Sequence, residues 1–264
     1  MFDLHLSGGL LYPHLQALNA LALSGIVVAL VLGGIVKGVT GIGVPLVAMP
    51  ILVHFMPVKA AVLLLSMPII LGNIPQAIEG GAILATARRI AAPLAGTVIG
   101  NVIGVSVLIA LEPHRAQFAS GAVLIVAAVL LLASPRLKLA PSLVMPVGFA
   151  FGFGAALMES IASVPGPLLA MYLLATGATG RQFTKQIAII LVVSIVTLVT
   201  TFTSGAHANA ADLAISAAAS LPAIAGMLLA RPLRDSLHPL AFRAVVLVCV
   251  LAAATQMIWK SGLL

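Results

Sequence analysis

The segment KGVTGIGVPLVAMPILV, Lys37 to Val53, interrupts a strongly apolar part of the chain. It carries a lysine, three glycines and two prolines where a membrane-spanning helix would otherwise continue. Glycine and proline end helices or bend them. A second apolar tract contains a similar interruption, SIASVPGP, at Ser160 to Pro167. The fold therefore depends on how the chain passes through these two interruptions.

The composition is that of a helical membrane protein. Of the 264 residues, 62% are hydrophobic and only 7% are charged, and the mean hydropathy is +1.24. A soluble domain of this size needs a charged surface that this chain cannot supply. Because about 20 apolar residues span the hydrocarbon core as a helix, the length allows at most about ten spans. It leaves no room for a separate soluble domain.

The charges and the cysteine exclude several classes of protein. The net charge of +7 comes from residues that stand singly or in pairs, so it does not form a nucleic-acid-binding face. The single cysteine, Cys249, cannot form an intrachain disulfide, and we expect it to be a small buried hydrophobic residue. No metal-ligand spacing, nucleotide loop or nucleophile triad occurs, which predicts no cofactor, no metal and no enzymatic activity. The first residues lack the positive start of a cleaved signal peptide, so we expect mature protein.

Six apolar runs predict single membrane spans. They are residues 60–78, 90–111, 116–133, 186–204, 213–230 and 241–259. Two further regions, 21–55 and 143–176, are too long for one span and contain the interruptions. Each of these regions is either one long kinked helix or a hairpin that enters and leaves the membrane on the same side.

The distribution of positive charge favours the hairpins. With two hairpins, nine of the 13 lysines and arginines fall on one side of the membrane: Arg88, Arg89, Arg136, Lys138, Arg181, Lys185, Arg231, Arg234 and Arg243. The other side receives Lys59, Arg115 and Lys260, while Lys37 lies within the first interruption. With two kinked helices the division becomes nearly even. The positive-inside rule favours the uneven division, which predicts both termini outside a plasma (inner) membrane and the arginine-bearing loops in the cytoplasm.

The two interrupted regions resemble each other. GVPLVAMPIL, Gly43–Leu52, aligns with PGPLLAMYLL, Pro165–Leu174, at an offset of 122 residues. Further along, Gly100 aligns with Gly226 at an offset of 126. The chain then consists of two halves, 1–138 and 139–264, each a broken hairpin followed by three spans. An odd number of full crossings inverts the second half, so we predict an all-α polytopic membrane protein of two inverted repeats with re-entrant hairpins, an architecture typical of secondary transporters.

The interruptions are suited to bind an anion near the middle of the membrane. Helices that begin after them carry Pro45 and Pro167 in their first turns, and a helix N-terminus favours an anion. Lys37 adds a full positive charge, unless its side chain snorkels to an interface. The predicted binding residues are Lys37, Gly38, Thr40, Gly41, Gly43, Pro45, Asn73, Gln76, Ser163, Val164, Pro165, Gly166 and Pro167.

Further polar residues have two interpretations each. Glu159 is a candidate for proton coupling, or else a structural partner of Lys37 or of a loop arginine. Ser160 and Ser163 could donate to the anion, but bonding to their own helix turn is favoured.

For the polar residues of two spans, interhelical contacts are the simpler interpretation. Asn73 and Gln76 either line the cavity or form interhelical hydrogen bonds. Asn101 lies in GTVIGNVIG, residues 96–104, whose glycines recur at every fourth position, and we assign it to close helix packing.

Two segments resemble the signature regions of the sulfite exporter TauE/SafE family. They are GGIVKGVTGIGVPLVAMPIL, residues 33–52, and GFAFGFGAALMESIASVPGPLLAMYLL, residues 148–174. GNIPQA at 72–77 and GTVIGNVIG at 96–104 are similar to the same family, and the resemblance covers nearly the whole chain. It implies transport, mostly export, of sulfur oxyanions and organosulfonates.

Together these observations predict a secondary transporter, an exporter of sulfite, sulfoacetate or another organosulfonate. Alternatives are an anion channel and a transporter of another small carboxylate or oxyanion. An intramembrane enzyme would need Lys37 and Glu159 to face one cavity. The expected partners are the small anion and the lipid bilayer, with no nucleic acid, and a homodimer is left open.

Overall fold

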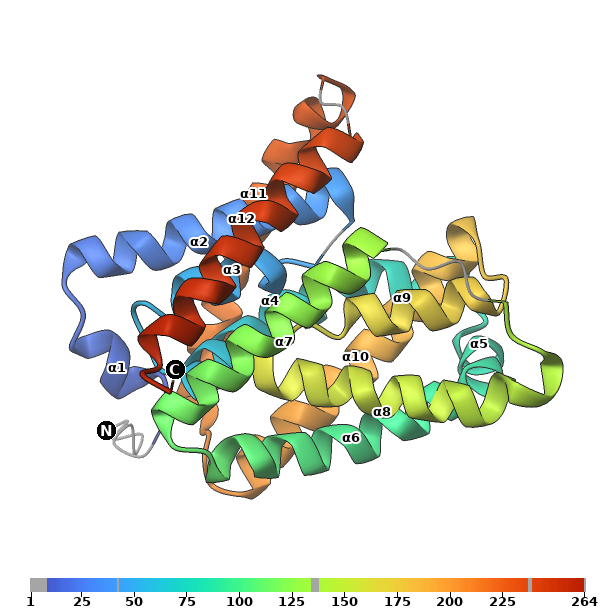
Figure 1. Ribbon diagram of the computed structural model, residues 1–264, viewed down its shortest axis with the longest axis horizontal. Coiled ribbons are helices and arrows are strands. Elements are labelled where there is room, and N and C mark those ends of the chain that lie inside the picture. Colours follow the sequence, from blue (N-terminus) through green and yellow to red (C-terminus); the bar gives the residue numbers. More distant parts are fainter. Residues whose placement is uncertain (1–8, 42, 134–137, 237–238, 264) are drawn as a thin grey trace.

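The chain is helical throughout the residues that the computed structural model describes, 9–41, 43–133, 138–236 and 239–263, with no strand among them (Figure 1). The helices are α1 (Tyr12–Gln16), α2 (Ala20–Thr40), α3 (Pro45–Leu52), α4 (Val58–Ile78), α5 (Ile83–Arg89), α6 (Ala91–Ala110), α7 (Pro113–Ala133), η2 (Pro141–Leu143), α8 (Val144–Ala162), α9 (Gly166–Ala175), α10 (Gly180–Ser204), α11 (Ala210–Ser236) and α12 (Pro239–Lys260). Within the described residues, eight helices are long and apolar enough to cross a membrane: α2, α4, α6, α7, α8, α10, α11 and α12. The predicted all-α polytopic membrane protein is confirmed.

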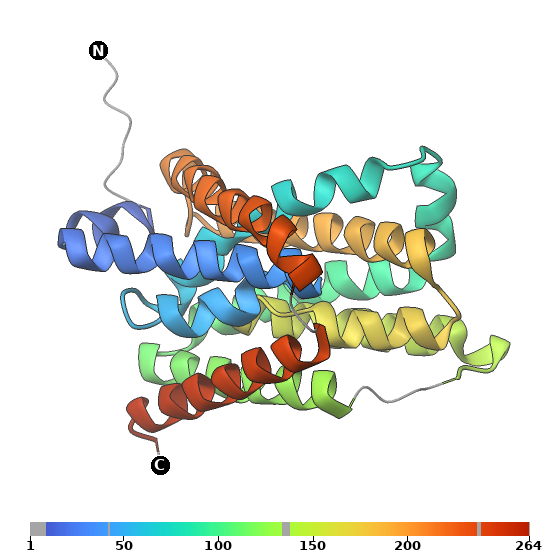
Figure 2. The same ribbon diagram turned by 90° about the horizontal axis from the view of Figure 1, so that it is seen from above.

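The two interrupted regions each form a long helix followed by a short one. Neither is a continuous rod, since α2 ends before α3 begins and α8 ends before α9 begins. In Figures 1 and 2, α2 and α8 enter from opposite ends of the molecule, and α3 and α9 return beside them. Both hairpin tips lie near the middle of the long axis, along which most helices run. The six predicted single spans coincide with α4, α6, α7, α10, α11 and α12.

Glycines bring each long hairpin helix into close contact with a helix of the other half of the chain. A Cβ atom added to Gly34 of α2 would lie 2.1 Å from the carbonyl oxygen of Ala223 in α11. On the other side, a Cβ atom at Gly96 of α6 would lie 2.2 Å from the carbonyl oxygen of Phe149 in α8. Only glycine permits such separations between backbones. The predicted packing role of the glycines at residues 96–104 is therefore confirmed.

Proline bends α4, and a neighbouring helix satisfies the groups that the bend releases. Pro68 has no N–H, so the carbonyl of Leu64 loses its helical donor. The hydroxyl of Ser216 in α11 donates to that carbonyl over 2.9 Å and accepts from the N–H of Met67 over 3.1 Å. Backbone groups at membrane depth need such partners, because lipid supplies none.

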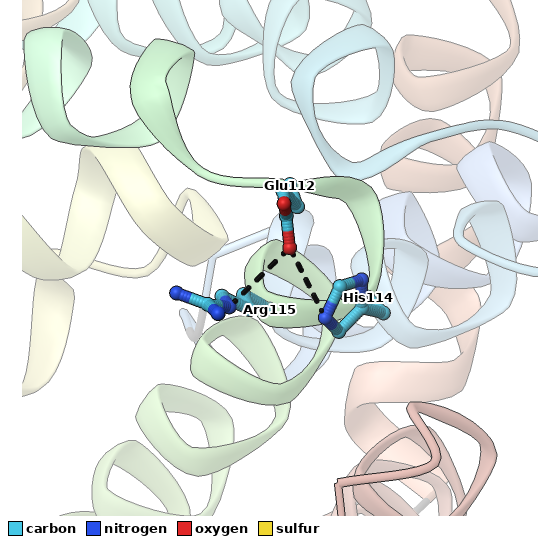
Figure 3. Close-up of polar contacts among 3 residues, drawn as sticks. All are labelled: Glu112, His114 and Arg115. Atoms are coloured by element: carbon cyan, nitrogen blue, oxygen red, sulfur yellow. Dashed lines mark ion pairs between the residues drawn. The ribbon is translucent and has the colours of Figure 1, made fainter.

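The basic residues at one end of the molecule contact the connection between α6 and α7. The ammonium of Lys59 donates to the carbonyl of Ile109 over 2.7 Å. Glu112 lies between His114 and Arg115, with its Oε2 atom 3.3 Å from His114 Nε2 and 3.4 Å from Arg115 Nε (Figure 3). These pairs are solvent-exposed, so they add little to stability. The Lys59 bond joins the start of α4 to the end of α6.

The N-terminal segment is attached to α11 through Asp212. This carboxylate is fully buried and accepts the N–H groups of Leu10 and Leu11 over 3.0 and 2.8 Å. Asp212 and Asn209 also bond reciprocally, each side chain accepting the other's N–H over 3.1 and 3.0 Å, which is a capping box at the start of α11. One carboxylate therefore serves the beginnings of both α1 and α11.

Cys249 does not have the predicted environment. It lies on α12 with an exposed side chain, so the expectation of a buried cysteine is wrong. Val245 and Val248 of the same helix are exposed as well. In a membrane protein an apolar exposed face of this kind contacts lipid, so hydropathy alone cannot separate lipid-facing from core positions.

Candidate functional site

The two long hairpin helices end in the same way. Gly41 ends α2 with a φ angle of 73°, and its N–H donates to the carbonyl of Lys37 over 2.9 Å. Ser163 ends α8 with a φ angle of 58°, and its N–H donates to the carbonyl of Glu159 over 2.7 Å. The left-handed conformation costs about 1 kcal/mol for a residue other than glycine. Ser163 is held in it by its surroundings.

The short helices start without a side-chain cap. Pro45 is the first residue of α3 and Pro167 the second residue of α9, so both lie in first turns as predicted. No side chain caps either start, so the first N–H groups have no side-chain acceptor. A Cβ atom at Gly41 or Gly166 would meet no atom within 4 Å. The backbone of both glycines is therefore open to close approach.

The two interruptions differ in burial. Val44, Ser163 and Val164 expose 5% or less of their surface, and Val44 and Val164 both belong to the central apolar core. Gly41 and Gly43 of the first interruption are exposed. The second interruption is therefore buried in protein, as backbone at membrane depth requires.

The side chain of Lys37 points toward α4. Its Nζ atom lies 3.4 Å from the carbonyl oxygen of Gly72. Next to Gly72, the side chain of Asn73 is buried and donates to the carbonyl of Ile69 over 2.6 Å within its own helix, so the interhelical interpretation of Asn73 is wrong. Gln76 is half-buried one turn further along. The structure therefore brings Lys37 close to the GNIPQA segment.

Two of the predicted binding residues of α2 have structural contacts. A Cβ atom at Gly38 would lie 2.4 Å from the Cβ of Ala230 in α11, so Gly38 is a packing position. The hydroxyl of Thr40 donates to the carbonyl of Val36 over 2.7 Å. Neither contact supports a direct role in binding.

Glu159 is fully buried and forms no ion pair with any residue that the structure describes. Its Oε2 atom accepts from the amide of Asn101 over 3.1 Å and from the hydroxyl of Ser194. Its Oε1 atom has no hydrogen-bond partner among the described residues. The expectation that Glu159 pairs with Lys37 or with a loop arginine is therefore wrong, because neutral side chains of α6 and α10 surround it.

Asn101 of α6 bonds to three side chains, Glu159 and Ser160 of α8 and Ser194 of α10. Its amide nitrogen donates to the hydroxyl of Ser194 over 2.7 Å, and its carbonyl oxygen accepts from Ser160 over 3.0 Å. Assigning Asn101 to packing alone and Ser160 to its own helix turn is therefore wrong. Ser163 does not bond to its own turn either, because its buried hydroxyl has no partner among the described residues.

Sequence reasoning missed Ser194. The signal available was a lone polar residue inside the apolar run IILVVSIV of residues 189–196. The repeat offset of 122 adds a second signal, because it aligns Ser194 with Gly72 and Glu159 with Lys37. In the structure Glu159 contacts Ser194 and Lys37 contacts Gly72. The same two positions therefore touch in both halves.

A separate cavity lies at the end of the molecule where α5 meets α10. Its volume is about 190 Å³, and its lining consists of Ala85, Thr86, Arg89, Gln182, Lys185 and Gln186. The ammonium of Lys185 also donates to the carbonyl of Gly81. Nearby, the Nε atom of Arg181 lies 3.9 Å from Oε1 of Glu79. Within the part of the chain that the structure describes, no group of His, Cys, Asp and Glu side chains could hold a metal ion.

Comparison with known proteins gave one finding. No curated protein and no solved structure matches the chain. The family model described as sulfite exporter TauE/SafE matches residues 26–257, which include the tips of both hairpins, six of the candidate spans completely and most of the first and last spans. The chain therefore belongs to the sulfite exporter TauE/SafE family.

Proposed function

We propose that this protein is a secondary transporter that exports a small sulfur-containing anion, such as sulfite, sulfoacetate or another organosulfonate, across the plasma membrane. Membership of the family supports a membrane anion exporter. The uneven distribution of basic residues supports an orientation with the end that carries Arg88, Arg89, Arg181 and Lys185 in the cytoplasm. Anion export in that orientation is driven by the membrane potential, at about 2.3 kcal/mol per charge for each 100 mV.

The anion binds between the N-termini of α3 and α9. The observation that carries this proposal is the pair of uncapped helix starts at tips that lie near the middle of the long axis. Each start presents backbone N–H groups and partial positive charge. The free space beside Gly41 and Gly166 lets a ligand approach the backbone closely. The two tips are formed by Gly43 and Pro45 in the first hairpin and by Pro165 and Pro167 in the second.

Lys37 supplies the full positive charge of the site. Its contact with the carbonyl of Gly72 is long for a hydrogen bond, at 3.4 Å, so little is lost when the ammonium turns toward an anion. A strong charge-assisted hydrogen bond to a sulfonate or sulfite oxygen then replaces a weak one. Asn73 and Gln76, on the same segment of α4, border this side of the site.

Alternating access follows from two inverted repeats, 1–138 and 139–264. The packing of α2 on α11 and of α8 on α6 supports this division, because each hairpin then rests on a helix of the other half. The equivalent ends of α2 and α8 at Gly41 and Ser163 support it as well. Rocking of one half against the other exposes the anion to each side in turn.

The test is exchange of labelled sulfite and sulfoacetate in proteoliposomes. Lys37→Ala removes one charged hydrogen bond worth about 1.5–3 kcal/mol, so half-saturation should require roughly 10- to 100-fold more substrate. Lys260→Ala removes an exposed lysine at the end of α12 and should exchange like the wild type. Normal exchange by Lys37→Ala would show that this charge is not part of the site.

The same preparation separates a transporter from an anion channel. A transporter shows saturation and counterflow, in which unlabelled substrate on one side accelerates movement of label from the other. A channel shows neither and carries a measurable current. Current without counterflow would contradict the proposed function.

A further inference from the structure

We propose that Glu159, with Asn101, Ser194 and Ser160, forms a proton-binding centre that couples proton movement to transport of the anion. This inference rests on the proposed function, because coupling requires that an anion is transported. It adds the coupling ion and the residues that hold it.

The geometry leaves one oxygen of Glu159 open. Oε2 is occupied by Asn101 and Ser194, whereas Oε1 is buried and has no donor among the described residues. The whole residue is inaccessible. A buried carboxylate oxygen without a donor is energetically unfavourable, and an isolated charge at membrane depth is more so. A proton on Oε1 removes the charge and provides a hydrogen-bond donor at the vacant side.

A second buried oxygen without a partner lies close by in the sequence. Ser163, four residues after Glu159, ends α8 in the left-handed conformation. Its hydroxyl is buried and also has no partner among the described residues. The end of α8 that forms the hairpin tip therefore carries two unsatisfied oxygens, one on Glu159 and one on Ser163.

The remaining atoms of the centre favour a proton over a metal cation. Both polar atoms of the Asn101 side chain already have partners. Its nitrogen donates to Glu159 and Ser194, and its oxygen accepts from Ser160. Among the described residues of α8 and its C-terminal cap, Glu159 Oε1 and the hydroxyl of Ser163 are the buried side-chain oxygens without a partner. A cation such as Na⁺ needs several oxygen ligands, whereas a proton needs one.

No charged side chain on the neighbouring helices lies beside this centre in the described part of the chain. The elements packed against α8 are α4, α6, α7, α9, α10 and η2. Their charged and titratable side chains are Lys59, His114, Arg115, Tyr172, Arg181 and Lys185. Tyr172 donates to the carbonyl of Val144 at the other end of α8, and the remainder lie at helix ends. Lys185, for example, precedes Ser194 by nine residues, or about 13 Å along α10.

The position of the centre explains how it can act on the anion. The carbonyl of Glu159 accepts the N–H of Ser163, so the proton-binding residue forms part of the turn that ends at the tip. Its equivalent in the first half is Lys37. One half therefore carries a fixed cation for the anion, and the other a carboxylate whose charge depends on a proton.

The experiment compares exchange with gradient-driven accumulation of labelled sulfoacetate in proteoliposomes of the full-length protein, with the membrane potential clamped. If one proton moves with each anion, wild-type accumulation should change by about tenfold per pH unit imposed across the membrane. Glu159→Gln keeps the shape and both hydrogen bonds but cannot take up a proton. It should lose the response of sulfoacetate accumulation to the pH gradient while still exchanging sulfoacetate at a measurable rate, which shows that the variant is folded. Glu112→Gln changes an exposed carboxylate and serves as the control, so it should keep both the exchange of sulfoacetate and the response to the pH gradient.

The outcomes separate the two proposals. If the wild type exchanges neither sulfoacetate nor sulfite, the proposed function fails and the coupling with it. If the wild type exchanges but Glu159→Gln still responds to the pH gradient, only the coupling centre is wrong. The coupling centre is also wrong if the wild type responds to a Na⁺ gradient instead of a pH gradient. Loss of exchange in a folded Glu159→Gln variant would contradict it as well.

A second variant covers the case in which Glu159→Gln does not fold. Ser194→Ala leaves the carboxylate in place and removes one of its two donors. It should retain exchange but change the pH at which accumulation is half-maximal. An unchanged pH profile in Ser194→Ala would contradict the assignment.

Discussion

Gly41 and Ser163 end their helices with the same bond, an N–H donated to the carbonyl four residues earlier. They are 122 residues apart, the offset at which the two hairpin sequences align. The carbonyls that accept these bonds belong to Lys37 and Glu159. Two hairpins of similar backbone therefore place a potential cation and a potential anion at equivalent positions. This difference agrees with the proposed roles of Lys37 in anion binding and of Glu159 in proton binding.

The left-handed turn at Gly41 predicts a specific sensitivity to alanine. Gly41 has a φ angle of 73°, which alanine adopts at a cost of about 1 kcal/mol. Space is not limiting, because a Cβ atom there would meet nothing within 4 Å. Gly41→Ala should therefore lower the free energy of unfolding by about 1 kcal/mol. Thermal unfolding in detergent would measure it as a lower midpoint.

Gly43→Ala is the matched control for this measurement. Gly43 has no positive φ angle, and a Cβ atom there would lie 3.4 Å from Pro45 Cδ, an ordinary contact. Its stability should stay within about 0.5 kcal/mol of the wild type. Equal losses at both positions would mean that the tip is sensitive to any side chain, and not to the backbone angle.

Much of the fold could be predicted from sequence because membrane helices follow hydropathy and backbone satisfaction. The six single spans and the two broken regions could be read from apolar runs and from the glycines and prolines around Gly41 and Pro167. The exposed position of Cys249 could not. Lipid and protein core are both apolar, so composition does not indicate which face of a helix is buried.

The candidate site was less predictable, for a physical reason. Residues near the breaks could be named because an interrupted helix leaves backbone groups without partners in lipid, which is tolerated only in protein or beside a cavity. The partners of Glu159 could not, because Asn101 and Ser194 lie on other helices, and hydrogen bonds between helices depend on their relative rotation. Gly38 illustrates the converse, since its place in the motif indicated binding, whereas its neighbours in α11 make it a packing residue.

Asp212 should control the attachment of the N-terminal segment. Asp212→Ala removes the acceptor of the N–H groups of Leu10 and Leu11 and half of the capping box with Asn209. Hydrogen bonds to a charged group contribute about 1.5–3 kcal/mol each, so stability should fall by at least about 2 kcal/mol. Hydrogen exchange of the amides at residues 10–16 should become much faster.

Asn209→Ala separates the capping box from the attachment. It removes the side chain that accepts the N–H of Asp212 but keeps the carboxylate that holds residues 10 and 11. The expected loss is about 1 kcal/mol, with slow exchange preserved at the N-terminal segment. Similar exchange in both variants would show that Asp212 acts only as a helix cap.

The cavity between α5 and α10 should attract the anion before it reaches the hairpin tips. Arg89 and Lys185 contribute positive charge to its lining, beside Thr86, Gln182 and Gln186. Charged entrances raise the local concentration of an oppositely charged substrate, and salt screens the effect beyond a Debye length of about 8 Å at physiological ionic strength. Arg89→Gln should therefore raise the substrate concentration for half-maximal sulfite exchange at low salt, by roughly two- to fivefold, and leave the maximal rate unchanged. At high salt the variant and the wild type should converge.

Arg115→Gln removes the same charge at the opposite end of the molecule, next to Glu112, and measures the effect of net charge alone. If Arg89→Gln raises the half-maximal sulfite concentration equally at low and high salt, the anion binds directly in this cavity. If Arg115→Gln raises it by the same amount, the cavity has no special part in attracting the anion.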